Sequence, residues 1–176
     1  MIYLDMDGVI TDFYKAVAQV ANIPVEEVIS KTIDHPHIED FVPEIWDKVN
    51  FDFWVKMPEL PWAFDLYNYL NDFDEVFFLS RPLNDVTCSA GKTAWLINRF
   101  GNKFDNYIFT RHKYLLAQPG AILIDDDPDN IESFKENAGE AIQFPVPTIK
   151  GYPTETDISN FKNDFEKAFR KIEKWI

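Results

Sequence analysis

The chain begins with MIYLDMDGVITDF (residues 1–13), in which a short apolar run is followed by two carboxylates and a glycine. Residues 2–4 have the composition of a buried strand. Asp5 and Asp7 then stand at the end of this strand, and Gly8 permits a tight turn that aims both side chains and nearby backbone N–H groups into one cleft. This stretch therefore predicts a strand that ends in an acidic turn.

Four further short apolar runs repeat the strand pattern, at 76–79, 107–109, 121–124 and 141–144. Segments with helical spacing lie between most of them, which is typical of a parallel sheet covered by helices. The pattern predicts a doubly wound α/β domain. A terminal amphipathic helix is expected within residues 157–176, with an apolar face formed by Ile158, Phe161, Phe165, Phe169 and Ile172.

The interval between the first two apolar runs is unusually long. It holds about seventy residues, more than one crossover helix requires. IPVEEVIS (23–30) and VPEIWDKVN (42–50) each have a proline placed to open a short helix, and the aromatic-rich FDFWVKMPELPW follows. We therefore predict a small helical cap over residues 14–58, inserted into a core formed by residues 1–13 and 59–176.

Composition limits the possible functions. The 176 residues are 46% apolar, enough for a hydrophobic core, and the single cysteine excludes an intrachain disulfide and favours a reducing compartment. No apolar run reaches the length of a membrane span, so we expect a cytoplasmic protein with no membrane partner. The formal charge of −13 disfavours long nucleic acid. A small anionic substrate remains possible where a metal and a few cations reverse the field locally.

Polar residues follow the other apolar runs as well. Ser80 and Arg81 come after the second run, Lys113 lies shortly after the third, and three aspartates at 125–127 end the fourth. Ligands of open α/β sheets bind beyond the carboxyl ends of the strands. We therefore expect these groups to meet Asp5 and Asp7 at one edge of the sheet.

Such a set of residues suits phosphate chemistry. Clustered carboxylates repel one another unless a hard cation such as Mg²⁺ lies between them, and a lysine and a serine suit phosphate oxygens. Asp5 and Asp7 fit a nucleophile and a general acid/base. The alternatives are a capped loop or a calcium site, although an EF-hand loop has glycine at its sixth position and Gly8 is the fourth residue counted from Asp5.

Two lysines compete for the phosphate-binding position, because both stand near predicted helix starts. Lys113 lies twelve residues before Asp125, on the segment that leads directly into that strand, and is favoured. Lys92 is otherwise interpreted as a solvated helix residue. Asp127 and Asp129 are interpreted as acidic residues at a helix N-terminus.

These motifs resemble those of a known superfamily. DMDGV, Ser80, Lys113 and the acidic cluster are similar to the four motifs of the haloacid dehalogenase-like (HAD) phosphatases. Within that superfamily, DMDGVITDF, FWVKMPELPWAFDLYNYL, KTAWLINRFG, TRHK and LIDDDPDN resemble the 5′(3′)-deoxyribonucleotidases, over residues 1 to 131. The resemblance implies a Rossmann-like core and Mg²⁺-dependent phosphate hydrolysis through an aspartyl-phosphate.

The resemblance also implies roles for individual residues. Asp5 is expected to be the nucleophile and a metal ligand, and Asp7 the general acid/base with its backbone carbonyl on Mg²⁺. Asp126 completes the metal site with Asp125 nearby. The residues expected to bind the substrate are Ser80, Arg81 and Lys113 for the phosphate and Phe13, Phe53 and Trp54 for the base. These three aromatic residues are equally consistent with ordinary packing between cap and core.

Three functions remain open at this point. The leading hypothesis is a Mg²⁺-dependent phosphomonoesterase acting on a nucleoside monophosphate. The second keeps the chemistry but has a sugar phosphate or another small phosphomonoester as substrate. The third is a non-catalytic protein that binds metal or nucleotide, which is disfavoured because such a protein has no need of Asp7.

Overall fold

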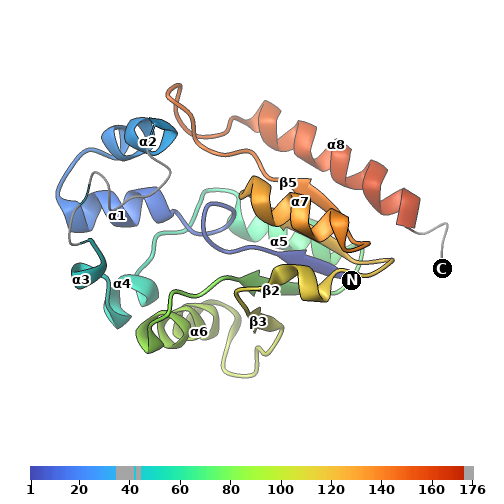
Figure 1. Ribbon diagram of the computed structural model, residues 1–176, viewed down its shortest axis with the longest axis horizontal. Coiled ribbons are helices and arrows are strands. Elements are labelled where there is room, and N and C mark those ends of the chain that lie inside the picture. The colour runs from blue at the N-terminus through green and yellow to red at the C-terminus, as the bar shows by residue number, and fades with distance from the viewer. Residues whose placement is uncertain (35–41, 43–44, 173–176) are drawn as a thin grey trace.

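The computed structural model describes residues 1–34, 42 and 45–172. Its centre is a five-stranded parallel sheet of order β3-β2-β1-β4-β5 (Figure 1). The strands are β1 (Ile2–Leu4), β2 (Val76–Ser80), β3 (Tyr107–Phe109), β4 (Ile122–Asp125) and β5 (Glu140–Gln143). All five predicted strands are therefore confirmed, with ends shifted by at most one residue.

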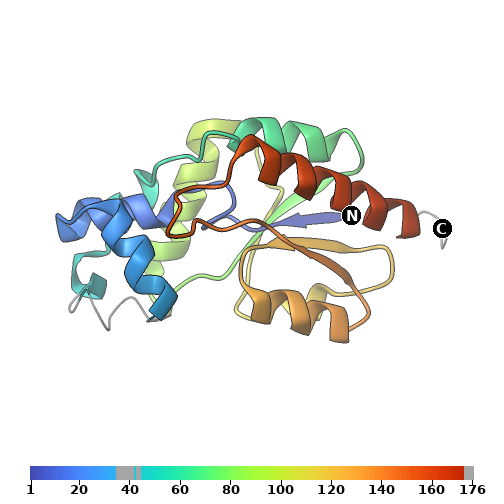
Figure 2. The ribbon, with the colours of Figure 1, turned by 90° about the horizontal axis from the view of Figure 1, so that it is seen from above.

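Helices cover both faces of the sheet (Figure 2). Ile2 and Leu4 of β1 point into the larger core, to which α5 (Ala63–Asn71), α6 (Val86–Phe100) and α8 (Glu155–Ile172) contribute. Tyr3, between them, points into the smaller core on the other face, formed with α7 (Pro128–Glu136). The alternation reflects the two-residue period of a strand and confirms the doubly wound α/β fold.

The terminal helix α8 presents the apolar face that the sequence predicts. Phe161, Phe165, Phe169 and Ile172 are buried in the larger core, and Ile158 packs against it. Residues 173–176 of the predicted helix lie outside the described residues.

The long interval after β1 folds into helices α1 (Phe13–Ala21), α2 (Val25–Asp34), α3 (Ile45–Lys48) and α4 (Phe51–Val55), at the left of Figure 1. Asp12 caps α1 and Asn50 caps α4, each accepting a hydrogen bond from a backbone N–H three residues later. Helix α4 was not expected, and Pro43, expected to open a helix, lies outside the described residues. The boundaries of a cap at 14 and 58 stay a prediction.

These helices do not form a separate core. Val17, Val28 and Trp54 belong to the same hydrophobic cluster as Ile2 of the central strand. A segment of this size buries too little surface to be stable alone, so it packs on the sheet domain.

The segment at 144–153 returns from β5 towards the first helix. The Tyr152 hydroxyl lies 2.9 Å from both carboxylate oxygens of Asp12, the N-cap of α1. This contact ties the connection to the start of α1. None of the helices that the structure describes is both long and apolar enough to cross a membrane.

Candidate active site

The turn after β1 places its two carboxylates at the carboxyl edge of the sheet. The Asp5 N–H donates to the Ile124 carbonyl at 2.9 Å, and the Thr11 N–H closes the turn on the Met6 carbonyl at 2.8 Å. Gly8 has a φ of +78°, and a Cβ there would lie 2.1 Å from Oδ2 of Asp126. Position 8 therefore has to be glycine, because the turn passes directly over the acidic group that follows β4.

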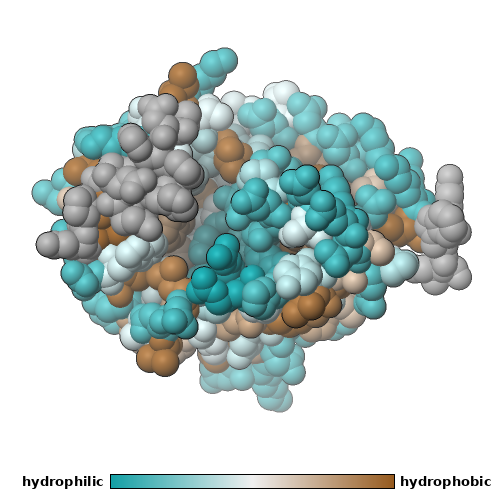
Figure 3. All heavy atoms as spheres, viewed as in Figure 1, coloured by the Kyte–Doolittle hydropathy of each residue, from teal (hydrophilic) through white to brown (hydrophobic). Residues whose placement is uncertain are grey.

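A cavity of about 340 Å³ opens at this edge, where hydrophilic side chains gather around a hollow in the middle of the molecule (Figure 3). A larger cavity, of about 740 Å³, lies between the connection at 144–153 and α8. The described carboxylates that can share a metal ion line the smaller cavity, which makes it the candidate site. The predicted residues that line it are Asp5, Asp7, Phe13, Ser80, Arg81, Lys113, Asp125 and Asp126.

Three carboxylates form the acidic centre of the cavity. One oxygen from each of Asp5, Asp125 and Asp126 lies within 4.8 Å of the others. Burial, together with the charges of Asp125 and Asp7, raises the pKa of Asp5 to about 7 against the lowering effect of Lys113. Burial and the negative charges of Asp5 and Asp125 likewise raise the pKa of Asp126 well above its usual range. Hard oxygen ligands that repel one another in this way fit Mg²⁺.

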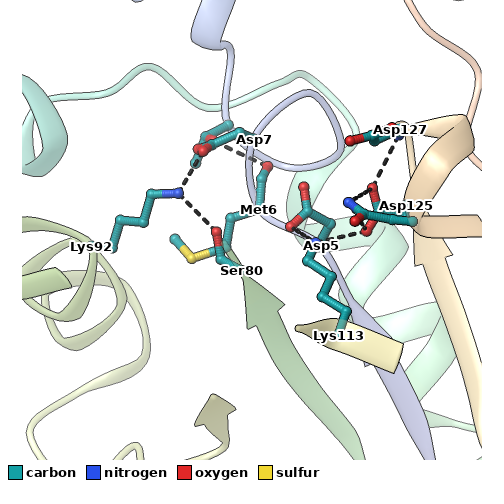
Figure 4. A network of polar contacts seen from close by, with 10 residues as sticks. Asp5, Met6, Asp7, Ser80, Lys92, Lys113, Asp125 and Asp127 are labelled. Carbon is teal, nitrogen blue, oxygen red and sulfur yellow. Dashed lines mark hydrogen bonds and ion pairs between the residues drawn. The ribbon is translucent and has the colours of Figure 1, made fainter. Parts of the chain in front are cut away.

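Lys113 forms ion pairs with two carboxylates of this acidic centre (Figure 4). It begins the 3-10 helix η2 (Lys113–Leu116), is 3% exposed, and places Nζ 2.5 Å from Oδ1 of Asp5 and 2.6 Å from Oδ2 of Asp125. Burial alone would lower the pKa of Lys113, but the two carboxylates raise it, so the amine stays charged. The favoured lysine thus lies in the cavity wall beside the expected nucleophile.

Asp125 is fixed by groups from the start of α7. Nδ2 of Asn130 lies 3.2 Å from both of its carboxylate oxygens, and the Asp127 N–H donates to Oδ1 at 3.0 Å. Asn130 was not predicted, although its position in the first turn of α7, five residues after Asp125, indicates that its side chain can reach that carboxylate. Asp127 is the N-cap of α7, as predicted.

The interpretation of Lys92 as a solvated helix residue was wrong. The side chain is 0% exposed, and its Nζ lies 2.5 Å from Oδ2 of Asp7 and 2.7 Å from Oγ of Ser80. The reason is its place on α6, four residues after Cys88 and three before Trp95, both buried. This spacing puts Lys92 on the apolar face of the helix and was the signal for its burial.

The Asp7 side chain points to Lys92 and not into the acidic centre. Its Oδ1 accepts a hydrogen bond from Oγ1 of Thr11 at 3.0 Å, and Asp7 is outside the group of carboxylates that can share a metal. Only its backbone carbonyl, as the resemblance implies, remains as an expected metal ligand. Thr11 is a further site residue that was not predicted from the sequence.

The three aromatic residues expected at the base are not equivalent. Phe13 lines the cavity, whereas Phe53 and Trp54 are buried in the hydrophobic core, Trp54 at 2% exposed. The ring centroids of Phe53 and Trp54 lie 6.2 and 6.4 Å from that of Phe13, so the two rings stand behind the cavity wall. Tyr14, which was not predicted, also lines the cavity, and burial and the charge of Asp126 raise its pKa.

The parallel sheet, with its acidic cavity beyond β1 and β4, has the fold of HAD-like hydrolases. Solved structures with a similar fold include a haloacid dehalogenase-like hydrolase from Streptococcus pneumoniae, at 15% identity over 92% of this chain and 90% of that one, with a TM-score of 0.52. A HAD family hydrolase from Deinococcus radiodurans has 14% identity over 91% and 86%, with a TM-score of 0.55. A HAD hydrolase from Bacillus subtilis has 12% identity over 81% and 85%, with a TM-score of 0.51.

The family is narrower than this class. The model of the family described as 5′ nucleotidase, deoxy (pyrimidine), cytosolic type C protein matches residues 1–166. The chain therefore belongs to this nucleotidase family, which confirms the resemblance and places it among the hydrolases of phosphoric monoesters. No match was found among the curated proteins.

Proposed function

We propose that this protein hydrolyses nucleoside monophosphates through an aspartyl-phosphate formed on Asp5. The observation that carries the proposal is the position of Asp5 in the cavity wall. Nζ of Lys113 lies 2.5 Å from Oδ1 of Asp5, and Asp7 follows two residues later in the same turn. Phosphoryl transfer to a carboxylate needs this combination of a nucleophile, a cation on the same side and a second carboxyl group for proton transfer.

We also propose that the site holds Mg²⁺. Asp5, Asp126 and the backbone carbonyl of Asp7 would be its ligands, with Asp125 beside them. Bound Mg²⁺ would offset the repulsion among the carboxylates and polarise a phosphate oxygen. Among the proteins with a similar fold, the Bacillus subtilis hydrolase has bound magnesium, which supports this proposal, and the Deinococcus radiodurans hydrolase has bound phosphate and sodium.

The side chains divide the reaction into two steps. In the first, a carboxylate oxygen of Asp5 forms a bond to phosphorus while the bond to the ester oxygen breaks, and Asp7 gives its proton to the leaving oxygen. In the second, Asp7 takes a proton from water, which attacks phosphorus and releases inorganic phosphate and free Asp5. Lys113 and Ser80 bind phosphate oxygens throughout, and Arg81, exposed directly after β2, also lines the cavity.

A nucleoside monophosphate is supported by the family to which the chain belongs and by Phe13 in the cavity wall. A second substrate class is also favoured by an observation. Because Phe53 and Trp54 are buried behind Phe13, the cavity offers fewer aromatic surfaces to a base than the sequence indicates, which suits a small phosphomonoester without a base.

A phosphate-release assay over a panel of substrates tests the proposal. It would contain 5′- and 3′-monophosphates of nucleosides and deoxynucleosides, sugar phosphates and a small alkyl phosphate. Stacking of a base on one ring contributes about 1–3 kcal/mol, so we expect kcat/KM to be roughly ten- to a hundredfold higher for nucleotides. A higher kcat/KM for sugar phosphates than for nucleotides would favour the second substrate class. If no ester releases phosphate, the proposed hydrolysis is excluded and the protein is a non-catalytic binder of metal or nucleotide.

A further inference from the structure

Lys92 is a charged group that the proposed reaction does not use directly. Its amine lies behind the cavity, in contact with Asp7 and Ser80, which both line the cavity while Lys92 itself does not (Figure 4). A fully buried ammonium group is costly unless it is paired and hydrogen-bonded. Lys92 meets this requirement with two partners that come from two different strand ends.

The contact with Asp7 completes the support of that carboxylate. Lys92 donates to Oδ2, and Thr11, which is itself buried, lies 3.0 Å from Oδ1. A carboxylate held at both oxygens keeps one side-chain orientation. Proton transfer requires such an orientation, because the acid must be within hydrogen-bond reach of the leaving oxygen.

The contact with Ser80 sets the direction of a hydroxyl group. A serine hydroxyl has one hydrogen to donate and two lone pairs to accept. Because the ammonium of Lys92 can only donate, Oγ of Ser80 accepts at 2.7 Å, and its own hydrogen is left to point into the cavity. Ser80 is thereby prepared to donate to a phosphate oxygen.

We propose that Lys92 is a positioning residue, whose single ammonium group holds Asp7 in the orientation for proton transfer and turns the Ser80 hydroxyl toward the phosphate. The inference rests on the proposed role of Asp7 as general acid/base. It adds a second lysine with a role distinct from that of Lys113, which contacts Asp5 and Asp125 on the other side of the cavity.

The test compares Lys92→Met with the unmutated protein on two aryl phosphates, p-nitrophenyl phosphate and phenyl phosphate. The phenolate leaving group depends on proton donation far more than p-nitrophenolate does. kcat/KM reports the steps up to formation of the aspartyl-phosphate. We therefore expect Lys92→Met to lower kcat/KM for phenyl phosphate roughly ten- to a hundredfold more than it lowers kcat/KM for p-nitrophenyl phosphate. Equal losses on the two esters would show a merely structural role and overturn the inference.

A second test places Lys92→Met in a background that lacks both groups it is proposed to position. In a variant with Asp7→Asn and Ser80→Ala, the burst of phenol released from phenyl phosphate in the first turnover measures phosphorylation alone. If Lys92 acts through Asp7 and Ser80, adding Lys92→Met changes the burst rate by less than about threefold. An additional loss as large as that caused by Lys92→Met in the otherwise unmutated protein would overturn the inference.

Further variants separate folding from positioning. Lys92→Gln keeps a donor for Asp7 and is expected to retain more activity on phenyl phosphate than Lys92→Met, with Lys103→Met, at an exposed position, as the control for charge removal. A Gln variant no better than the Met variant on phenyl phosphate would contradict the inference. Because neither ester contains a base, the result is independent of nucleotide preference. Absence of ester hydrolysis in the unmutated protein would defeat the proposed function and this inference together.

Discussion

Trp54 of α4 packs directly on the backbone of Gly91 in α6. A Cβ at position 91 would lie 2.4 Å from Cβ of Trp54 and 3.0 Å from the Phe51 carbonyl oxygen. The contact joins the helical segment after β1 to the helix that carries Lys92. The ring of Trp54 also lies under that lysine, with Nζ 5.1 Å from the ring centroid.

We expect Gly91→Ala to destabilise the protein. Alanine in a helix interior is normally favoured over glycine by about 1 kcal/mol, but here the added methyl group overpacks the contact with α4, which costs about 1–3 kcal/mol. Urea unfolding measures the difference, and Ala90→Gly, one residue earlier at an exposed position, reports the helix propensity without the contact. A Gly91→Ala protein more stable than the unmutated one would show that α4 does not press on α6 in solution.

Asp5→Asn is expected to abolish turnover without unfolding the protein. An amide is a poor nucleophile, so kcat should fall by at least about a thousandfold. The charge that is removed is one that burial and Asp125 disfavour, so the melting temperature of the metal-free protein should not fall. Phosphate release and calorimetry measure the two effects, with Asp129→Asn, an exposed carboxylate in the first turn of α7, as the matched control. Near-normal turnover in Asp5→Asn would exclude the aspartyl-phosphate.

Metal removal should stop the reaction and lower stability. In excess chelator we expect no phosphate release, and at a hundred times the dissociation constant Mg²⁺ should raise the free energy of unfolding by about 2.7 kcal/mol. Asp126→Asn should reduce this Mg²⁺-dependent shift because Asp126 contributes one of the clustered oxygens, whereas Asp129→Asn should leave it unchanged. Full activity of a protein shown to be metal-free would contradict the proposed site.

Phe13 and Trp54 should give different results when replaced by alanine. Phe13 faces the cavity, so Phe13→Ala is expected to raise KM for a nucleotide by roughly ten- to a hundredfold and to change KM for a small alkyl phosphate little. Trp54 is in the core, so Trp54→Ala is expected to cost about 3–5 kcal/mol of stability.

Steady-state kinetics and urea unfolding of both variants check this pair. An unchanged KM for nucleotides in Phe13→Ala would assign that ring to packing. A Trp54→Ala protein of full stability that loses nucleotide selectivity would return Trp54 to the base-binding role expected from the sequence.

The local pattern of the chain was sufficient to predict most of the fold. Each strand is a short apolar run between polar residues, and the apolar face of α8 follows from its spacing. The convergence of Asp5, Ser80 and Asp125 was predictable too, because the carboxyl ends of neighbouring parallel strands meet at one edge. These features depend on residues close in sequence and on one general rule of sheet topology.

The environment of individual side chains depended on contacts between distant segments. The spacing of Lys92 from Cys88 and Trp95 places it on the buried face of α6, but its charge is tolerated there only because its amine contacts Asp7, 85 residues away, and Ser80. Trp54 is held in the core by the close approach of α4 to Gly91, and Phe53 is buried beside it. Sequence alone therefore indicated which groups gather at the acidic edge of the sheet. The packing of α4 against α6 decided which side chains face the cavity, because the burial of a charge or a ring depends on partners that only the tertiary structure supplies.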